Sequence, residues 1–329
     1  MTTTQLSFYL LCYFINTCFC IHLYQITPPV DHGEGPTWDC RKNLLYFVDI
    51  HAGNVYSYEP SSGNLHSIHL NGEVSPVIPS KRDPELLIVG VNRTVVAVEW
   101  NGNSSDYQSK PLVTVSKQFP MSRFNDGKAD KQGRLWFGTM GYETSTSLAP
   151  NQGSLYKITR DNLHNPSVMI SPVNISNGLA WNKANNKFYY IDTPTRKIVE
   201  YDYDDAGGEI KNGRVVFDLS WYSSIKGFPD GMTIDRDDNL WVALYSGSAV
   251  IKVDPKTGYL LQIVAIPAEA VTSVIWGGQN LDVLYITTSR YRLNKEQRLK
   301  QPYAGSVFAL TDLGTGGVKG FKADIVDEI

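Results

Sequence analysis

The chain has 329 residues, a hydrophobic content of 42% and a formal net charge of −3. The hydrophobic content suffices for a packed core, and the weak negative charge gives no basic face, so we expect no nucleic-acid partner. The cysteines lie at positions 12, 18, 20 and 40, which leaves only one of them outside an apolar N-terminal stretch. An intramolecular disulfide framework in the globular part is therefore excluded, and the lack of a CxxC pair argues against a cysteine zinc site.

The apolar stretch at residues 6–21 is too short for a comfortable membrane span but has the length of a signal-peptide core. Residues 1–20 contain no Lys or Arg, so the usual positive segment of a signal peptide is missing. Residues 1–20 are accordingly interpreted as an apolar leader that is a signal peptide, an uncleaved anchor or an extension without function. A signal peptide would place the protein in the secretory pathway or outside the cell. We expect residues 21–329 to form one domain.

A sequence pattern recurs along this domain. Each copy starts with a polar residue, usually followed by Gly, and continues with an apolar-polar alternation, a polar turn and a second apolar run. Four clear copies start at Glu34, Asp126, Asn177 and Asp230, and two weaker ones start at residues 75 and 273. Period-two alternation bounded by turn residues is typical of short antiparallel strands. Six copies at a period of about 40–50 residues predict an all-β fold, a six-bladed β-propeller.

The blades can be assigned in chain order. Residues 22–30 are expected to form a strand that completes the last blade and so closes the ring. Blade one runs from residue 34 to about residue 68, and blade two contains the apolar runs 86–91 and 94–100. Blades three, four, five and six start near residues 123, 177, 230 and 273, and a charged loop at 290–302 interrupts blade six.

The polar residues at the start of the copies predict a metal site. The first strand of each blade lines the channel of a propeller, so residues at equivalent positions should converge on its axis. Glu34, Asn177 and Asp230 supply two carboxylates and an amide, with Asp126 and Asn125 nearby. Such oxygen ligands suit one divalent cation, Ca²⁺ foremost, with Mg²⁺, Mn²⁺ and Zn²⁺ as alternatives. A single Asp-Gly or Asn-Gly pair is an ordinary turn dipeptide. The prediction of a metal site therefore depends on the equivalent position of these residues in each copy of the repeat.

Further side chains are expected near the same site. Arg123 offers a planar fork of donors for carboxylate or hydroxyl oxygens, although a structural ion pair is its ordinary alternative role. Glu143 falls at a strand end from which it could reach the mouth of the channel, and His32 is interpreted as a wall residue. The chain contains neither HExxH nor GxSxG, so a zinc protease or serine hydrolase is poorly supported.

The motifs GEGPTWD, RFNDGKAD, GTM, ISNGLAW, FPDGMTID with NLWVA, and GVKG occur in this order between residues 30 and 320. They closely resemble those of the family of regucalcin, gluconolactonase and luciferin-regenerating enzyme. The resemblance implies a six-bladed propeller with one axial divalent metal and lactone hydrolysis. It assigns the metal ligands to Glu34, Asn177 and Asp230 and the substrate contacts to Arg123, Asn125 and Glu143. The apolar leader and the longer GTGGVKG turn depart from the family pattern, whose cytosolic members lack a leader.

The sequence as a whole therefore predicts a metal-dependent lactone hydrolase of the gluconolactonase type. Asp230 is expected both to bind the metal and to accept a proton from water, with Asp126 as the alternative base. Arg123 and Asn125 would hold the substrate and stabilise developing negative charge. Two alternatives stay open: a calcium-binding regulatory protein without enzymatic activity, and an enzyme of the luciferin-regenerating type. The expected partner is a small lactone bound by a monomer with no obligatory protein partner, and the resemblance favours the cytoplasm.

Overall fold

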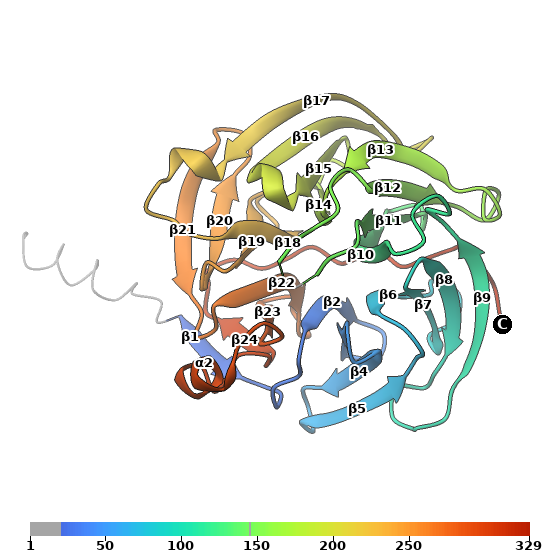
Figure 1. The fold of residues 1–329 in the computed structure, drawn as a ribbon, viewed down its shortest axis with the longest axis horizontal. Coiled ribbons are helices and arrows are strands. Elements are labelled where there is room, and N and C mark those ends of the chain that lie inside the picture. Colours follow the sequence, from blue (N-terminus) through green and yellow to red (C-terminus); the bar gives the residue numbers. More distant parts are fainter. Residues whose placement is uncertain (1–20, 145) are drawn as a thin grey trace, which may run out of the picture.

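The computed structural model describes residues 21–144 and 146–329. Its strands form six four-stranded antiparallel sheets, arranged as blades around a central channel (Figure 1). The predicted all-β, six-bladed propeller is confirmed. The leader proposed for residues 1–20 lies outside the described residues. Within the described ranges, no helix is long and apolar enough to cross a membrane.

Each of the first five blades takes four consecutive strands, which run from the channel to the rim. Blade one contains β2 (Gly33–Asp39), β3 (Leu44–Asp49), β4 (Asn54–Glu59) and β5 (Asn64–His69). Blade two contains β6 (Val74–Pro79), β7 (Leu86–Val91), β8 (Thr94–Glu99) and β9 (Gln108–Thr114). Blade three contains β10 (Arg123–Ala129), β11 (Leu135–Met140), β12 (Gly153–Ile158) and β13 (Ser167–Val173).

The remaining blades follow the same order. Blade four contains β14 (Ser176–Trp181), β15 (Lys187–Asp192), β16 (Lys197–Asp204) and β17 (Glu209–Asp218). Blade five contains β18 (Phe228–Ile234), β19 (Leu240–Tyr245), β20 (Ala249–Asp254) and β21 (Tyr259–Ala265). Blade six contains β22 (Ala270–Gly277), β23 (Val283–Ser289) and β24 (Phe308–Thr311), and the helix α2 (Lys295–Lys300) lies between its last two strands. Short 3₁₀ turns, η1 (Thr193–Thr195) and η2 (Leu219–Trp221), flank strands of blade four.

The N-terminal strand closes the ring. Strand β1 (His22–Gln25) pairs antiparallel with β24 and is the outermost strand of blade six. The Gln25 side chain also donates a 2.9 Å hydrogen bond to Ser306 Oγ. The expectation that the first strand completes the last blade is therefore confirmed, although the strand is shorter than the predicted range.

The polar turns of the repeat have a structural role. Asp130 and Asp235 are completely buried, and each accepts a hydrogen bond from the indole N–H of a Trp six residues later, at 2.9 Å from Trp136 and 3.1 Å from Trp241. The two indole rings are themselves buried between neighbouring blades. Because a buried carboxylate needs such partners, these aspartates stabilise the turns and are not ligand sites.

A β-bulge interrupts the first strand pair of every blade near the position where the polar residue stands. The register shifts lie between Glu34 and Thr37, Val74 and Val77, Phe124 and Gly127, Asn177 and Leu179, Pro229 and Met232, and Val271 and Ser273. A bulge leaves one or more residues outside the regular pairing and re-aims their side chains. The bulges therefore allow neighbouring residues of one strand to present polar groups at the same end of the channel.

Gly231 stands at one of these bulges, where β18 approaches the next blade. A Cβ at this position would lie 2.0 Å from Ser273 Oγ and 2.7 Å from Ser273 Cα. Because a backbone atom is involved, rotation of the serine cannot relieve the clash. We expect Gly231→Ala to lower the free energy of unfolding by about 1–3 kcal/mol, measured by urea denaturation. Gly320→Ala is the matched control, since no atom lies within 4 Å of the added Cβ there. Equal stability of both variants would contradict this account.

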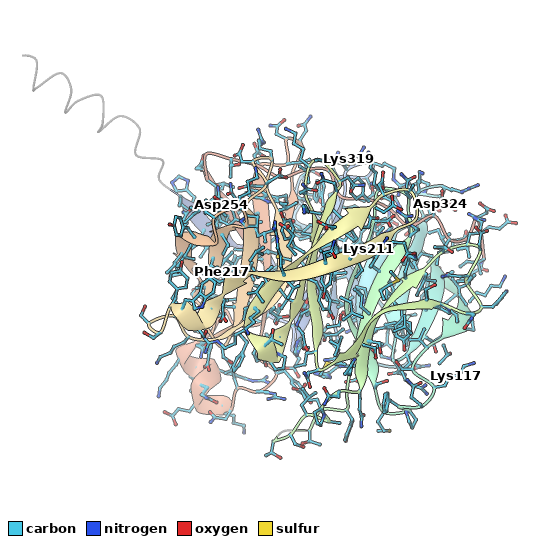
Figure 2. All side chains as sticks on the ribbon, turned by 90° about the horizontal axis from the view of Figure 1, so that it is seen from above. Lys117, Lys211, Phe217, Asp254, Lys319 and Asp324 are labelled. Atoms are coloured by element: carbon cyan, nitrogen blue, oxygen red, sulfur yellow. The ribbon has the colours of Figure 1, made fainter. Side chains whose placement is uncertain are left out.

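The two faces of the propeller differ. Figure 2 shows Lys319 and Asp324 on one face, whereas helix α2 and Lys117 lie on the opposite face. The C-terminal segment crosses the first face through isolated bridges from Gly317 to Asp235 and from Ala323 to Ser80. We call the channel end on the α2 face the mouth, because β2, β10, β14 and β18 begin there.

Candidate metal and substrate site at the mouth

Four polar side chains from four blades meet at the mouth. Glu34, Asp126, Asn177 and Asp230 are all buried, with 2–6% of each residue exposed. Burial raises the pKa of Asp230 well above its ordinary value, and the charges of Glu34 and Asp126 raise it further. A hydrogen bond from the Asn177 side chain acts in the opposite direction. Glu34, Asp126 and Asn177 thus all act on Asp230, which places the residues predicted from their equivalent positions in the repeat in one group.

The carboxylates repel one another and are largely shielded from solvent. Burial raises the pKa of Glu34 to about 8, the charge of Asp126 adds to this effect, and the N–H of Gly35 and the charge of Arg123 oppose it. Burial also raises the pKa of Asp126, against the opposing charge of Lys128. Since each group would gain from a nearby positive charge, the mouth is electrostatically suited to a cation.

Two oxygen atoms at the mouth have the character of open ligands. Asn177 Nδ2 donates to Thr193 Oγ1 at 2.8 Å, and that hydroxyl donates to the carbonyl of Pro229 at 2.9 Å, so the amide orientation is fixed. The other amide atom, Asn177 Oδ1, is buried and has no hydrogen-bond partner within residues 21–144 and 146–329, and the same holds for Asp126 Oδ2. Buried acceptors normally have a partner, and a bound cation would provide one. Among the residues described, no three His, Cys, Asp or Glu side chains form a metal-binding group by themselves, so this site depends on the amide.

Arg123 and Asn125 are linked to each other. Arg123 Nη1 donates to Asn125 Oδ1 at 2.8 Å and to the carbonyl of Phe124 at 2.9 Å. Asn125 Nδ2 donates to the carbonyl of Ser176 at 3.0 Å and thereby connects blades three and four. Both polar atoms of Asn125 are thus engaged in the protein. This residue orients Arg123, whose guanidinium reaches the cleft above the channel.

Glu143 lies in a cleft of about 620 Å³ that Arg123 also lines. We call it the mouth cleft. The charge of Arg123 acts on both Glu34 and Asp230, which connects this cleft to the buried side chains. The Glu143 carboxylate forms a 2.7 Å ion pair with Arg292, which belongs to the charged loop of blade six. Side chains that line the mouth cleft include His51, Glu73, Arg123, Glu143, Tyr291 and Arg292. Arg123 and Glu143, predicted from the sequence, therefore share one cleft.

Four of the lining residues were not predicted. His51 Nδ1 lies 2.7 Å from Glu73 Oε1, and Glu73 in turn lies 3.9 Å from Arg123 Nε. The ring of Tyr291 stacks on that of His51 with centroids 3.9 Å apart. The propeller topology could have indicated two of them. The loop between the second and third strands of each blade lies at the mouth, and this loop contains His51 in blade one and Tyr291 in blade six. The predicted wall residue, His32, lies with its ring 5.1 Å from that of His51.

The amino-acid sequence matches a known family of proteins over most of its length. The sequence model of the SMP-30/Gluconolactonase/LRE-like region matches residues 32–290. Regucalcin of Bos taurus is 38% identical over 287 residues, which cover 87% of this chain and 92% of the bovine protein. Regucalcin of Homo sapiens is 37% identical with the same coverage.

Solved structures show the same fold. A luciferin-regenerating enzyme is 35% identical, with a TM-score of 0.87 over 92% of this chain and 99% of its own. A calcium-binding protein, regucalcin from Agrobacterium tumefaciens, is 20% identical with a TM-score of 0.81 over 91% of this chain and 96% of its own. A gluconolactonase from Xanthomonas campestris is 19% identical with a TM-score of 0.69 over 88% of this chain and 89% of its own. Family match, identity and coverage together show that the chain belongs to the SMP-30/gluconolactonase/LRE-like family.

Proposed function

We propose that the protein is a metal-dependent hydrolase that opens small lactones of the gluconolactone type. The observation that carries this proposal is that the buried carboxylates of Glu34, Asp126 and Asp230 act on one another and on Asn177, whose Oδ1 has no hydrogen-bond partner among the described residues. A buried cluster of like charges is costly unless a cation or a proton compensates it. Such clusters with shifted pKa values are characteristic of functional sites.

Glu34, Asn177 and Asp230 would hold one divalent cation, with Ca²⁺ the first choice because all donors are oxygens. A bound cation supplies Lewis acidity toward a lactone carbonyl and makes water a better nucleophile at neutral pH. Few protein ligands leave room for water and substrate oxygens, which a purely structural calcium site would not need.

Asp230 is the proposed proton acceptor. Burial and the charges of Glu34 and Asp126 favour its protonated form, and a bound cation would restore the ionised form that can accept a proton from water. Asp126 belongs to the same group, and its Oδ2 has no hydrogen-bond partner in the described part of the chain, which makes Asp126 the alternative base. Lys128 holds a positive charge near Asp126 and favours its ionised form.

Arg123 and Glu143 are the proposed substrate contacts. The Arg123 guanidinium is preorganised by Asn125, so it can donate to substrate oxygens or to a developing oxyanion at little entropic cost. Glu143, which belongs to the same blade as Arg123, can accept hydrogen bonds from substrate hydroxyls in the mouth cleft. Asn125 acts on the substrate through Arg123, because its own amide is engaged with Arg123 and Ser176.

The deciding experiment is a screen of small lactones with protein stripped of metal by a chelator, alone and after addition of Ca²⁺, Mg²⁺, Mn²⁺ or Zn²⁺. Hydrolysis is measured as the release of acid from the opened lactone. Hydrolysis that needs a divalent metal supports the proposal. Metal binding without hydrolysis of any lactone would overturn it and favour a calcium-binding regulatory protein. The likeness to a luciferin-regenerating enzyme at 35% identity favours a second candidate, the corresponding chemistry at the same mouth cleft. That candidate would be tested with the oxidised product of a luciferase as substrate.

Arg123→Ala should lower kcat/KM for a lactone by about 10–100-fold, the loss expected for a charge-assisted hydrogen bond. Calcium affinity, measured by titration calorimetry, should not fall, since the change takes a positive charge away from Glu34 and Asp230. Arg236→Ala removes the same charge near the C-terminal segment, where Arg236 bonds Gly316, and serves as the control. A parallel loss of calcium affinity and turnover would instead make Arg123 a residue that positions the metal ligands.

A further inference from the structure

We propose that Arg292 is a specificity-determining residue that binds a negatively charged group, a carboxylate or a phosphate, on the substrate. The inference rests on the proposed lactone hydrolysis and names the kind of lactone that the mouth cleft favours. It starts from the charged loop of blade six, which the repeat did not explain.

Arg292 reaches across the mouth. It follows β23 in blade six, and its Nη2 contacts Glu143 Oε1 at 2.7 Å and the carbonyl of Thr144 at 3.3 Å, both in blade three on the opposite side of the ring. Its charge is also felt by Tyr245, whose pKa burial raises to about 12 and Arg292 lowers, while Asp230 and Glu143 raise it. Arg292 therefore spans the mouth from blade six to blade three and lines the cleft that a substrate would occupy.

The loop that carries Arg292 is rigidly held. Arg298 of helix α2 donates from Nε to the carbonyl of Leu293 at 3.0 Å and from Nη2 to the carbonyl of Arg290 at 3.2 Å. The same Nη2 lies 3.0 Å from Asp31 Oδ1, at the N-terminal side of β2. Tyr291 adds its stacking on His51. Arg292 is consequently preorganised at the mouth, as a binding residue should be.

The charge pattern explains why a second guanidinium is useful there. The buried carboxylates of Glu34, Asp126 and Asp230, together with Glu73 and Glu143 in the lining of the mouth cleft, would repel an anionic substrate. Arg292 neutralises Glu143 and places a second guanidinium in the cleft that Arg123 already lines. Both contacts to blade three use Nη2, so within the described chain the rest of the planar fork retains donors for a ligand. A planar fork fits carboxylate and phosphate oxygens in a bidentate manner.

The test compares three substrates on calcium-loaded full-length protein. Gluconolactone is neutral, a monolactone of glucaric acid carries a carboxylate, and phosphorylated gluconolactone carries a phosphate. We expect kcat/KM to be higher for at least one anionic lactone than for gluconolactone. The comparison of the two anionic lactones shows whether Arg292 favours a carboxylate or a phosphate. The advantage should shrink as salt is added. A neutral preference in the wild type would overturn the proposal.

Variants assign the effect to the residue. Arg292→Gln should lower kcat/KM for the preferred anionic lactone by about 10–100-fold, with a loss for gluconolactone at least about tenfold smaller. Arg292→Lys should retain part of the preference, since it keeps the charge and loses the fork. Arg290→Gln removes a charge from the same loop, but its side chain lies toward Asp31, so the preference should persist. Equal losses for neutral and anionic lactones in Arg292→Gln would show that Arg292 only braces the mouth.

A binding measurement separates this inference from the proposed hydrolysis. Glucarate and gluconate, which cannot be hydrolysed, are titrated calorimetrically into calcium-loaded wild type and Arg292→Gln. Tighter binding of glucarate that disappears in the variant supports the role of Arg292 even if no lactone is turned over. Equal binding of both acids in the wild type would overturn the inference while leaving lactone hydrolysis standing.

Discussion

Asp230→Asn should lower lactone turnover by a factor of about 10² to 10⁴, the range typical of losing a positioned general base. The amide keeps an oxygen for the metal and the size of the side chain but cannot accept the proton. Calcium affinity should weaken, because one of the three carboxylates at the mouth is lost. Turnover is therefore measured at saturating calcium, so that lost metal occupancy cannot imitate lost chemistry.

Two comparisons make this result specific. Asp106→Asn changes an exposed carboxylate far from the mouth and should retain full activity. Asp126→Asn tests the alternative base, whose unpartnered Oδ2 makes it the other acceptor at the site. If Asp230→Asn turns over lactones at the wild-type rate and Asp126→Asn does not, the two roles are exchanged. If both variants are fully active, neither carboxylate is the base.

Metal-free protein should become less stable as the pH rises from about 4.5 to about 8. The pKa of Glu34 is raised from 4.5 to about 8 in the folded protein, so the folded state binds more protons than the unfolded state in this window. Its contribution is fully present below the unfolded pKa and is lost as the pH rises through the folded pKa. Burial acts in the same direction on Asp126 and Asp230. For Glu34 alone, the shift sets an upper bound of about 5 kcal/mol.

The measurement is urea denaturation of chelated protein at several pH values across this window, repeated with calcium. Calcium should stabilise most at high pH, where it binds the ionised carboxylates, and should thereby remove the decline. Glu34→Gln should flatten the decline in the chelated protein, since it has no proton to lose. Stability that increases with pH in the chelated protein would contradict the raised pKa of Glu34.

The sequence was sufficient for the blades because every copy repeats the same local chemistry. The alternation of apolar and polar residues and the turn residues specify the strands. Asp126, Asn177 and Asp230 occupy equivalent positions in their copies of the repeat, and the propeller topology brings these positions together at its axis. The glycines after them signalled close approach, as Gly231 and Ser273 show. The bulge in each first strand pair was not predicted, since register depends on how two strands pair and not on either strand alone.

The rim of the site was less predictable because it is built from loops that differ between blades. Arg292 sits in a charged segment whose direction depends on helix α2 and its bond from Arg298, and the repeat contains no such helix. A local signal for that helix was present, since Asn294 and Gln297 form a capping box at its start. The contact between His51 and Glu73 joins two different loops. The spacing of these residues in the sequence therefore gave no indication that they would meet.

The pairing of β1 with β24 has a consequence for how the protein is made. The bond between Gln25 and Ser306 joins residues 281 positions apart, so blade six cannot be finished until almost the whole domain has left the ribosome. Until then the edge of β24 is absent and β1 has no partner, while the earlier blades can already pair their own consecutive strands. Such long-range contacts raise the relative contact order and slow the last step of folding. Closure of the ring therefore couples the two ends of the domain into a single cooperative unit, and a nascent chain would depend on protection of its unpaired first strand until synthesis ends.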